Sequence, residues 1–371
     1  MVHNYSINSW NYFNPVNIIF GENALSQINN FLKDESNIFL ITSPSFSKNG
    51  IVDKLSSLLS KKNLIIFDQI TPNPTSDEID DLFISSKNMN IDVVIALGGG
   101  SVIDTAKIFS YMYATKNSFP ILELINSGHD FDQKKQVKLF AIPTTAGTGS
   151  EVTPYATIWD NKGKKKFSAS GPSLFPNYAI LDPILLSTLS YDNILYPALD
   201  SISHALESLW NRNSTQISIS FALKALFLVE KNLISALSSE DIQAKSCLLE
   251  ASNLSGLAIS QTRTAIAHSI SYPLTVNYGV PHGLAVSFTL VELLRLNYNF
   301  LSNLSPTENI FLKIEVLLSN LNLSKLILSY VNLEQVLNLS HEMNAKGRFE
   351  NYIGDLPNGI NGLLKSSLCL K

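Results

Sequence analysis

Cysteine is scarce in this sequence. Its two cysteines, Cys247 and Cys369, are too few and too far apart for a disulfide framework or a structural zinc cluster. We therefore expect a protein of the reducing cytoplasm. No apolar run approaches the roughly 20 residues of a membrane-spanning helix, and the N-terminus lacks the pattern of a secretion signal. We expect neither a membrane partner nor export.

Charge of either sign is also sparse. Charged residues make up 16% of the chain and the net charge is −4. The one basic block, residues 164–166, is short, so we do not expect nucleic-acid binding. The hydrophobic fraction of 45% is enough for a large core, and 371 residues are enough for two domains.

Short apolar runs alternate with helical patterns in the first half of the chain. Continuous apolar strands between helices are typical of a parallel sheet that is covered on both faces. We expect Ser76 to cap its helix. The expected strands are 17–21 (with its turn), 37–42, 64–67, 92–97, 139–143 and 178–181, and the expected helices are 24–32, 52–59 and 76–88.

Strand patterns are almost absent after residue 187, where helical periodicity takes over. We expect helices at 217–236 and 241–260 and more of them between 306 and 337. The stretch from Gly347 has no clear pattern. These changes predict an α/β domain at 1–184 and an all-α domain at 185–371.

Histidine is rare, yet three of the six histidines fall near one aspartate in sequence. Asp200 and His204 are four residues apart, so on a helix they share one face. His268 lies in a second helical pattern, and His282 lies in a turn that opens the next apolar segment. A carboxylate and imidazoles in this arrangement indicate a divalent-metal site. The alternative is that Asp200 pairs with a nearby cation and the histidines are core residues.

Two glycine-rich loops follow expected strands. Gly98, Gly99, Gly100 and Ser101 lie between a strand and a helix, where a close backbone and free N–H groups favour phosphate binding. A second loop, rich in glycine and hydroxyls, follows the strand at 139–143. Two such loops at strand ends of one sheet suit a dinucleotide that lies across the sheet edge. The alternative is a pair of plain tight turns.

Together these motifs resemble the iron-containing alcohol dehydrogenase family. The resemblance implies a Rossmann-like dinucleotide-binding domain, a helical domain, and the fold shared with dehydroquinate synthase. It implies NAD(P)H and a divalent metal, Fe(II) before Zn(II) or another ion, in a small-molecule enzyme that forms a homodimer or higher homo-oligomer. The implied metal ligands are Asp200, His204, His268 and His282, and the implied cofactor residues are Gly98, Gly99, Gly100, Ser101, Asp104, Thr144, Thr145, Thr148 and Lys166. For Lys166 the alternative is a solvated basic turn.

The chain departs from the family pattern at two positions. Many members have a second histidine four residues after the third ligand, where this chain has Tyr272. Its hydroxyl would contact substrate or its ring would only pack. Members that prefer NAD often have an aspartate after the second strand, where this chain has Ser43. A serine does not repel a 2′-phosphate, which favours NADPH.

Arg263 is the remaining unusual residue, because it falls within an otherwise small and apolar helical stretch that leads to His268. A buried guanidinium needs an anionic partner. That partner is either an internal carboxylate, Glu207 or Glu250, or the anionic end of a substrate, which arginine binds by bidentate pairing. The sequence at residues 203–210, 262–264 and 270–275 resembles that of the family branch that reduces phosphonoacetaldehyde to 2-hydroxyethylphosphonate.

The expected reaction is a metal-dependent reduction of a small, anionic aldehyde by NAD(P)H, with Arg263 and Tyr272 at the substrate. One alternative is a general alcohol or diol dehydrogenase that works with NAD. A dehydroquinate-synthase-like lyase is a second, and it is disfavoured because few basic residues are available for a polyanionic sugar phosphate. A non-catalytic oligomeric protein is a third, and the intact metal and cofactor motifs argue against it.

The Ser43 position generates a prediction about cofactor choice. We expect NADPH to support turnover at least as well as NADH, and Ser43→Asp to shift the preference toward NADH, because the new carboxylate would repel the 2′-phosphate. The ratio of kcat/KM values for the two cofactors measures this. Strict dependence of the unaltered enzyme on NADH would contradict it.

Overall fold

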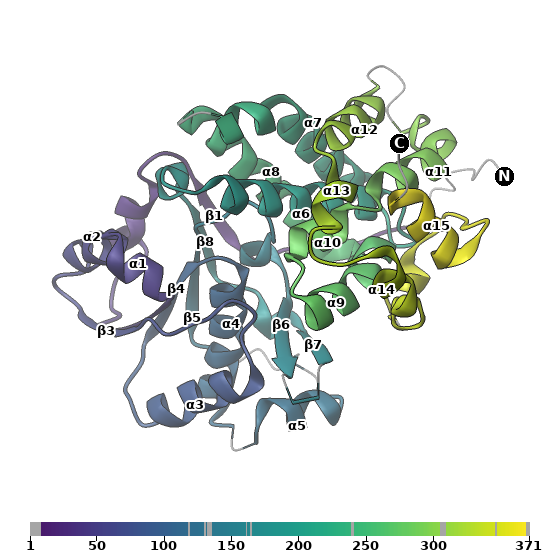
Figure 1. Ribbon diagram of the computed structural model, residues 1–371. Helices are drawn as coiled ribbons and strands as arrows, with labels where there is room; N and C mark the ends of the chain where they lie inside the picture. Colours follow the sequence, from purple (N-terminus) through teal and green to yellow (C-terminus); the bar gives the residue numbers. More distant parts are fainter. Residues whose placement is uncertain are drawn as a thin grey trace.

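The computed structural model describes residues 9–117, 119–129, 131, 136–160, 162–163, 165–238, 241–304, 309–345 and 347–368. Lys164, Cys369 and part of the segment around residue 306 lie outside these ranges. In Figure 1 a sheet with its helices lies to the left and a helical part to the right. This confirms the expected parallel α/β part followed by a helical part, whereas the division between residues 184 and 185 stays a prediction.

Six parallel strands form the sheet of the first part. Their order is β1-β8-β5-β4-β2-β3, so the strands that precede the two glycine-rich loops, β4 and β5, are neighbours at its centre. Their registers pair Gly98 with Pro143, so both loops leave the same edge of the sheet. The strands are β1 (Asn17–Phe20), β2 (Asn37–Thr42), β3 (Asn63–Phe67), β4 (Val93–Gly98), β5 (Lys138–Pro143) and β8 (Tyr178–Leu181).

Both faces of this sheet are covered, which explains its continuous apolar strands. Alternate residues of β2 join different clusters: Leu40 packs with Leu25 and Leu55, while Phe39 packs with Phe109 on the other face. The elements around the sheet include η1 (Ala24–Asn30), α1 (Pro44–Lys48), α2 (Ile51–Leu58), α3 (Ser76–Ser86) and α4 (Gly100–Thr115), and α5 (Ile121–Asn126) packs on α3.

Two local expectations were wrong. The segment expected to be a helix at 24–32 forms a 3-10 helix that ends at Asn30. Ser76 is the first residue of α3 and not its cap: Thr75 accepts from the Glu78 N–H through its hydroxyl, and the Glu78 carboxylate accepts from the Thr75 N–H. Two-way capping of this kind satisfies N–H groups at both positions, which a single serine would not do.

An antiparallel hairpin between β5 and β8 was missed altogether. It consists of β6 (Tyr155–Asp160) and β7 (Lys165–Ser170), which pair with each other and not with the large sheet. Ala156 and Ile158 bury their side chains with Ile108 of α4. The hairpin therefore lies on α4, and β7 also contacts α9 in the helical part (Figure 1).

Helices make up the described elements after β8, apart from one bridge between Asn211 and Tyr352. No helix in the described ranges is long and apolar enough to cross a membrane. Cys247 is a half-buried free thiol. The longer helices are α6 (Tyr191–Leu209), α7 (Gln216–Ser238), α8 (Ile242–Thr262), α9 (Ile266–Tyr278), α11 (Leu290–Leu301), α12 (Ile310–Asn320) and α15 (Gly359–Leu368). The shorter ones are α10 (His282–Ser287), α13 (Leu323–Ile327) and α14 (Leu333–Asn338). Short 3-10 helices are η2 (Ser150–Val152) and η3 (Pro172–Leu174) before β8, and η4 (Pro183–Leu186), η5 (Ser340–Glu342) and η6 (Phe349–Asn351) after it.

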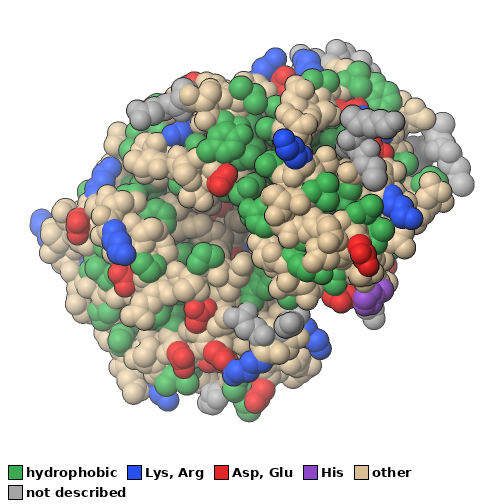
Figure 2. Space-filling model, viewed as in Figure 1, with side chains coloured by type: hydrophobic (Ala, Val, Ile, Leu, Met, Phe, Trp, Pro, Cys, Tyr) green, Lys and Arg blue, Asp and Glu red, His purple; other side chains and the backbone are tan. Residues whose placement is uncertain are grey.

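The surface view agrees with the sparse charge of the sequence. On the face drawn in Figure 2, basic and acidic side chains are interspersed and do not gather by sign. The same view is hollowed near its centre, between the two parts of the chain.

Two glycines allow the parts to meet backbone to backbone. Gly149 follows the second glycine-rich loop with φ +59°, and Gly256 lies within α8. A Cβ on Gly256 would lie 2.7 Å from the Gly149 Cα, a contact that only a backbone shift could relieve. This approach fixes the second glycine-rich loop against the helical part.

Gly256→Ala should therefore destabilise the protein by about 1–3 kcal/mol through overpacking. In an unobstructed helix the same change stabilises by up to about 1 kcal/mol. The sign of the change in unfolding free energy, measured by denaturant titration, is thus diagnostic. An alanine variant as stable as the parent would mean that this contact is looser than described.

Candidate active site

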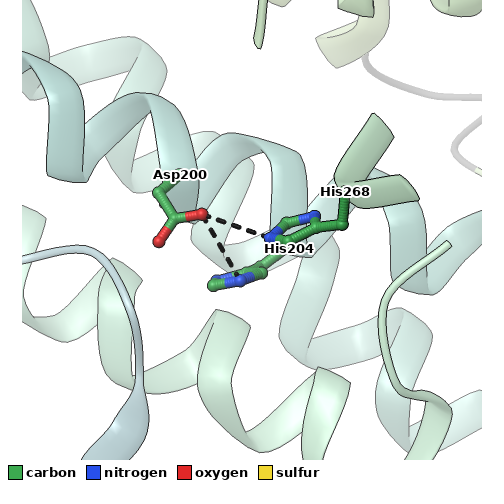
Figure 3. Close-up of side chains that lie close together, drawn as sticks. All are labelled: Asp200, His204 and His268. Atoms are coloured by element: carbon green, nitrogen blue, oxygen red, sulfur yellow. Dashed lines mark ion pairs between the residues drawn. The ribbon is translucent and has the colours of Figure 1, made fainter. Parts of the chain in front are cut away.

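Asp200, His204 and His268 point toward one another between two helices (Figure 3). Asp200 and His204 are one turn apart on α6, and His268 is near the start of α9. The Asp200 Oδ1 atom lies 3.5 Å from His204 Nε2 and 3.4 Å from His268 Nε2. All three side chains are buried, and their donor atoms lie within 4.8 Å of one another.

His282 completes the cluster from the first residue of α10. Its Nε2 atom lies 3.7 Å from Asp200 Oδ1. The glycine that follows it explains how α10 comes so close to α6: a Cβ on Gly283 would lie 1.8 Å from the Tyr196 carbonyl oxygen. Any side chain at position 283 would push His282 away from Asp200.

Glu207 fixes the orientation of His268. Its Oε1 atom accepts hydrogen bonds from the N–H groups of Ala267 (2.6 Å) and His268 (3.2 Å) at the start of α9. Its Oε2 atom is in hydrogen-bond contact with His268 Nδ1. Since Nδ1 thereby donates its proton to a carboxylate, Nε2 is left as a lone-pair donor that faces Asp200. Glu207 was considered as a partner of Arg263, and the structure instead assigns it to His268.

The cluster fits a divalent cation. Asp200 Oδ1 and His268 Nε2 are buried and have no hydrogen-bond partner among the described residues. Burial by itself would raise the pKa of Asp200, yet the neighbouring histidines, His204 foremost, hold that pKa below its usual value. One carboxylate and three imidazoles, counting His282, make an oxygen and nitrogen donor set that suits Fe(II) or Zn(II).

A cavity of about 530 Å³ runs from the start of α4 to these four residues. Its wall combines α4, the β6–β7 hairpin, α6, the end of α8, α9 and the turn at 347–348. Both parts of the chain therefore contribute to one space. Such a cavity, with convergent polar groups, is the usual form of a small-molecule site.

The glycine-rich loops meet at the α4 end of the cavity. Gly99 caps α4, so the first N–H groups of that helix are free for an anion. Gly100, Ser101 and Thr148 line the cavity. A Cβ on Gly100 would lie 2.7 Å from Thr148 Cγ2, so glycine is needed for the two loops to pack together.

The other predicted cofactor residues have different positions. Asp104 lines the cavity and accepts hydrogen bonds from Ser150 Oγ and the Thr157 N–H, which ties α4 to the hairpin. Thr144 is buried beneath the loop, and its N–H donates to the carbonyl of Gly98 at 3.1 Å. The rest do not line the cavity: Gly98 ends β4, Gly99 follows it with Thr145 nearby, and Ser43 follows β2, far in sequence from any lining residue.

Lys166 lies on β7, inside the cavity wall, and not in a solvated turn. Its ammonium is 4.1 Å from the ring centroid of Tyr272 and 5.3 Å from that of Trp159. Burial, with the charge of Arg348, lowers the pKa of Lys166 to about 7. Tyr272 also lines the cavity one turn after His268, and burial raises its pKa to about 12.

Arg263 lines the cavity, but the premise that it is buried was wrong. Arg263 follows α8, its side chain is exposed, and its Nη2 atom donates to Ser170 Oγ at 3.4 Å. Neither Glu207 nor Glu250 forms an ion pair with it in the described part of the chain. Its φ is +62°, which is strained for any residue with a side chain. Sequence reasoning saw a helix and could not see that it ends at Thr262.

Arg348 is a cavity residue that sequence reasoning missed. It follows Gly347 in the stretch without a clear pattern, and its guanidinium carbon lies 4.7 Å from the Tyr272 ring centroid. No local signal distinguishes this arginine in the sequence. Only the fold brings the turn at 347–351 beside α9.

Family models match both parts of the chain. Residues 15–183 match the model described as iron-containing alcohol dehydrogenase, and residues 194–353 match the C-terminal model of the same family. A solved sulfoacetaldehyde reductase from Bifidobacterium kashiwanohense, in complex with NAD⁺, superposes with a TM-score of 0.87 at 25% identity, over 97% of this chain and 98% of that one.

Two relatives are similar in sequence. A phosphonoacetaldehyde reductase of Streptomyces viridochromogenes is 35% identical over 228 residues, which are 60% of this chain and 58% of the relative. An aldehyde-alcohol dehydrogenase of Entamoeba histolytica is 30% identical over 72% of this chain and 32% of its own length. The matches therefore span less than two thirds of both relatives.

The Glu207 contact generates a prediction about metal affinity. Glu207→Gln should weaken metal binding roughly 10- to 100-fold, because an amide that donates toward Nδ1 disfavours the tautomer that leaves Nε2 free. The metal dissociation constant, measured by competition with a chelator, reports this. Glu250→Gln on α8 is the matched control.

His282→Ala tests the fourth ligand. It should remove most bound metal and nearly all turnover while the fold persists, because an alanine offers no donor atom to the ion. Metal content by mass spectrometry and a melting curve measure the two effects. Full metal occupancy in the variant would remove His282 from the ligand set.

Proposed function

Because the chain belongs to the iron-containing alcohol dehydrogenase family, whose members are nicotinamide-dependent alcohol oxidoreductases, we propose that it reduces a small aldehyde to a primary alcohol. The proposed substrate is phosphonoacetaldehyde and the product is 2-hydroxyethylphosphonate. The observation that carries this choice is a group of cationic side chains, Lys166, Arg263 and Arg348, in the same cavity as the metal ligands. Similarity to a phosphonoacetaldehyde reductase supports it.

Asp200, His204, His268 and His282 would hold the divalent metal. Polarisation of a carbonyl group, with stabilisation of negative charge on its oxygen, is the chemistry that such a metal supplies when bound. Glu207 keeps His268 in the ligating tautomer through its contact with Nδ1. The buried position of the cluster excludes most water, which strengthens these electrostatic effects.

The loops at the start of α4 would hold the dinucleotide. The free N–H groups after Gly99, with Ser101 and Thr148, face the cavity and suit its pyrophosphate. Hydride is what a reduced nicotinamide supplies when bound. Because the cavity continues from these loops to the histidines, a nicotinamide and a carbonyl carbon can meet inside it.

Reduction also consumes a proton. Tyr272 is one turn from His268 and keeps its hydroxyl proton at neutral pH, because burial raises its pKa to about 12. The Lys166 ammonium lies beside the Tyr272 ring in the cavity wall and carries protons that it can release. We assign these two residues to proton delivery, with water linking them to the alkoxide.

The test is an aldehyde panel on protein loaded with Fe(II), run with NADH and with NADPH. The panel contains phosphonoacetaldehyde, sulfoacetaldehyde and uncharged propionaldehyde. Phosphonoacetaldehyde should exceed propionaldehyde in kcat/KM on the order of 100-fold or more, because the uncharged aldehyde leaves the cationic groups unpaired. Phosphorus NMR of the product identifies 2-hydroxyethylphosphonate.

The panel also decides among the alternatives. Equal kcat/KM values for charged and uncharged aldehydes would favour a general alcohol dehydrogenase, and preference for sulfoacetaldehyde would move the substrate to a sulfonate. The His268→Ala protein, treated with the same metal, is the control for background reduction. Turnover that persists in that control would contradict the metal-dependent reaction.

A further inference from the structure

The cavity contains more positive charge than its described carboxylates neutralise. Asp200 faces the histidines, and Asp104 accepts from Ser150 and Thr157. Within the described residues, no carboxylate forms an ion pair with Lys166, Arg263 or Arg348. Cations in a partly buried wall without internal partners favour an anionic ligand.

Arg348 is fixed by closer contacts than Arg263. Its Nε atom donates to Thr264 Oγ1 at 3.2 Å, and its guanidinium packs on the Tyr272 ring. The turn that carries it is fixed by Asn351, whose side-chain amide donates to the carbonyls of Thr264 (3.0 Å) and Gly347 (2.9 Å). The two terminal nitrogens of the Arg348 guanidinium have no acceptor among the described residues. They can therefore donate hydrogen bonds to a bound ligand.

Arg263 is placed differently. It is exposed, whereas Arg348 is half-buried. Its Nη2 atom already donates to Ser170, and its guanidinium carbon lies 5.7 Å from the ring centroid of Tyr155. Charges at the solvent-exposed rim of a site raise the association rate of a ligand more than its binding affinity, because water and salt screen them.

The position of Arg348 relative to the metal ligands suits a short substrate. The Tyr272 ring, on which Arg348 packs, is nearly parallel to the His282 ring, with 6.4 Å between centroids. Arg348 and His282 are thus both neighbours of the Tyr272 ring, and both line the same cavity. In phosphonoacetaldehyde a single methylene separates the phosphonate from the carbonyl, so its anion needs a cationic group near the metal ligands, and Arg348 is such a neighbour through Tyr272.

We propose that Arg348 determines specificity by pairing with the tetrahedral oxyanion of the substrate, and that Tyr272 and Thr264 position its guanidinium. This inference rests on the proposed function and names the residue that gives the site its preference. Arg263 then contributes less to substrate binding, because solvent screens its exposed charge. The bidentate fork of arginine matches phosphonate oxygens in a way that a lysine ammonium does not.

The experiment compares Arg348→Met, Arg348→Lys and Arg263→Met, with Arg295→Met on α11 as a remote control. Arg295 is a surface residue that pairs with Glu292 and Glu315. The first readout is the ratio of kcat/KM values for phosphonoacetaldehyde and propionaldehyde. The second is calorimetric binding of ethylphosphonate, an unreactive anion, to the holoenzyme.

Arg348→Met should lower the ratio roughly 30-fold or more, mainly through KM, and should weaken ethylphosphonate binding by a similar factor. Arg348→Lys should recover part of both. Arg263→Met should change either by less than about fivefold, as for an exposed charge. Arg348→Gln, which can still bond to Thr264, replaces the methionine variant if that protein melts early.

Three results would overturn the assignment. The first is an Arg348→Met enzyme that keeps its preference while Arg263→Met loses it. The second is wild-type holoenzyme that does not bind ethylphosphonate. The third is a matching loss of NADH affinity in Arg348→Met, which would assign the arginine to the cofactor. If wild type binds ethylphosphonate through Arg348 but does not reduce phosphonoacetaldehyde, the proposed substrate fails and the anion site stands.

Discussion

The position of His268 in the proposed metal site depends on one buried carboxylate. Glu207, fully buried on α6, accepts from two N–H groups at the start of α9 and from the His268 ring. An unpaired charge in such a place would cost several kcal/mol, so α9 must begin where these donors meet Glu207. That requirement brings His268 to Asp200, which lies two turns before Glu207 on the same helix. Helix packing and ligand geometry are thus set by one group of hydrogen bonds.

Charge is distributed unevenly along the cavity, and this distribution orients a ligand. Asp200 places negative charge at the metal end, while Lys166 and Arg348 lie against Tyr272 and Arg263 lies near Tyr155 on the cavity wall. The anionic end of a ligand is therefore drawn to these cations and kept from Asp200, which leaves its carbonyl end for the metal site. The lowered pKa of Lys166, about 7, reflects burial and the charge of Arg348 on the same wall.

Features with a fixed local period could be read from the sequence. The four-residue spacing of Asp200 and His204 required only a helix, and the strand before Gly98 required only an apolar run, so both were foreseeable. The contacts that depend on tertiary structure were not. Arg348 reaches Tyr272 because Asn351 anchors its turn to Thr264. Arg263 is exposed because α8 ends one residue earlier. Neither feature produces a repeating pattern of residues in the sequence. The β6–β7 hairpin was missed because it lies outside the large sheet and is held by its packing on α4.

That hairpin explains how one fold can separate cofactor binding from substrate choice. The two glycine-rich loops follow β4 and β5, whose registers in a covered parallel sheet leave little freedom to vary. Lys166 and Ser170 are instead on β7, outside the large sheet, and Arg348 is on a turn of the helical part. Changes at these positions alter the charge facing the substrate without disturbing the sheet edge or the α6–α9 contact at Glu207. The residues proposed to set specificity therefore lie outside the large sheet, on elements where a substitution disturbs little packing, while those proposed to bind cofactor and metal lie where the packing is most constrained.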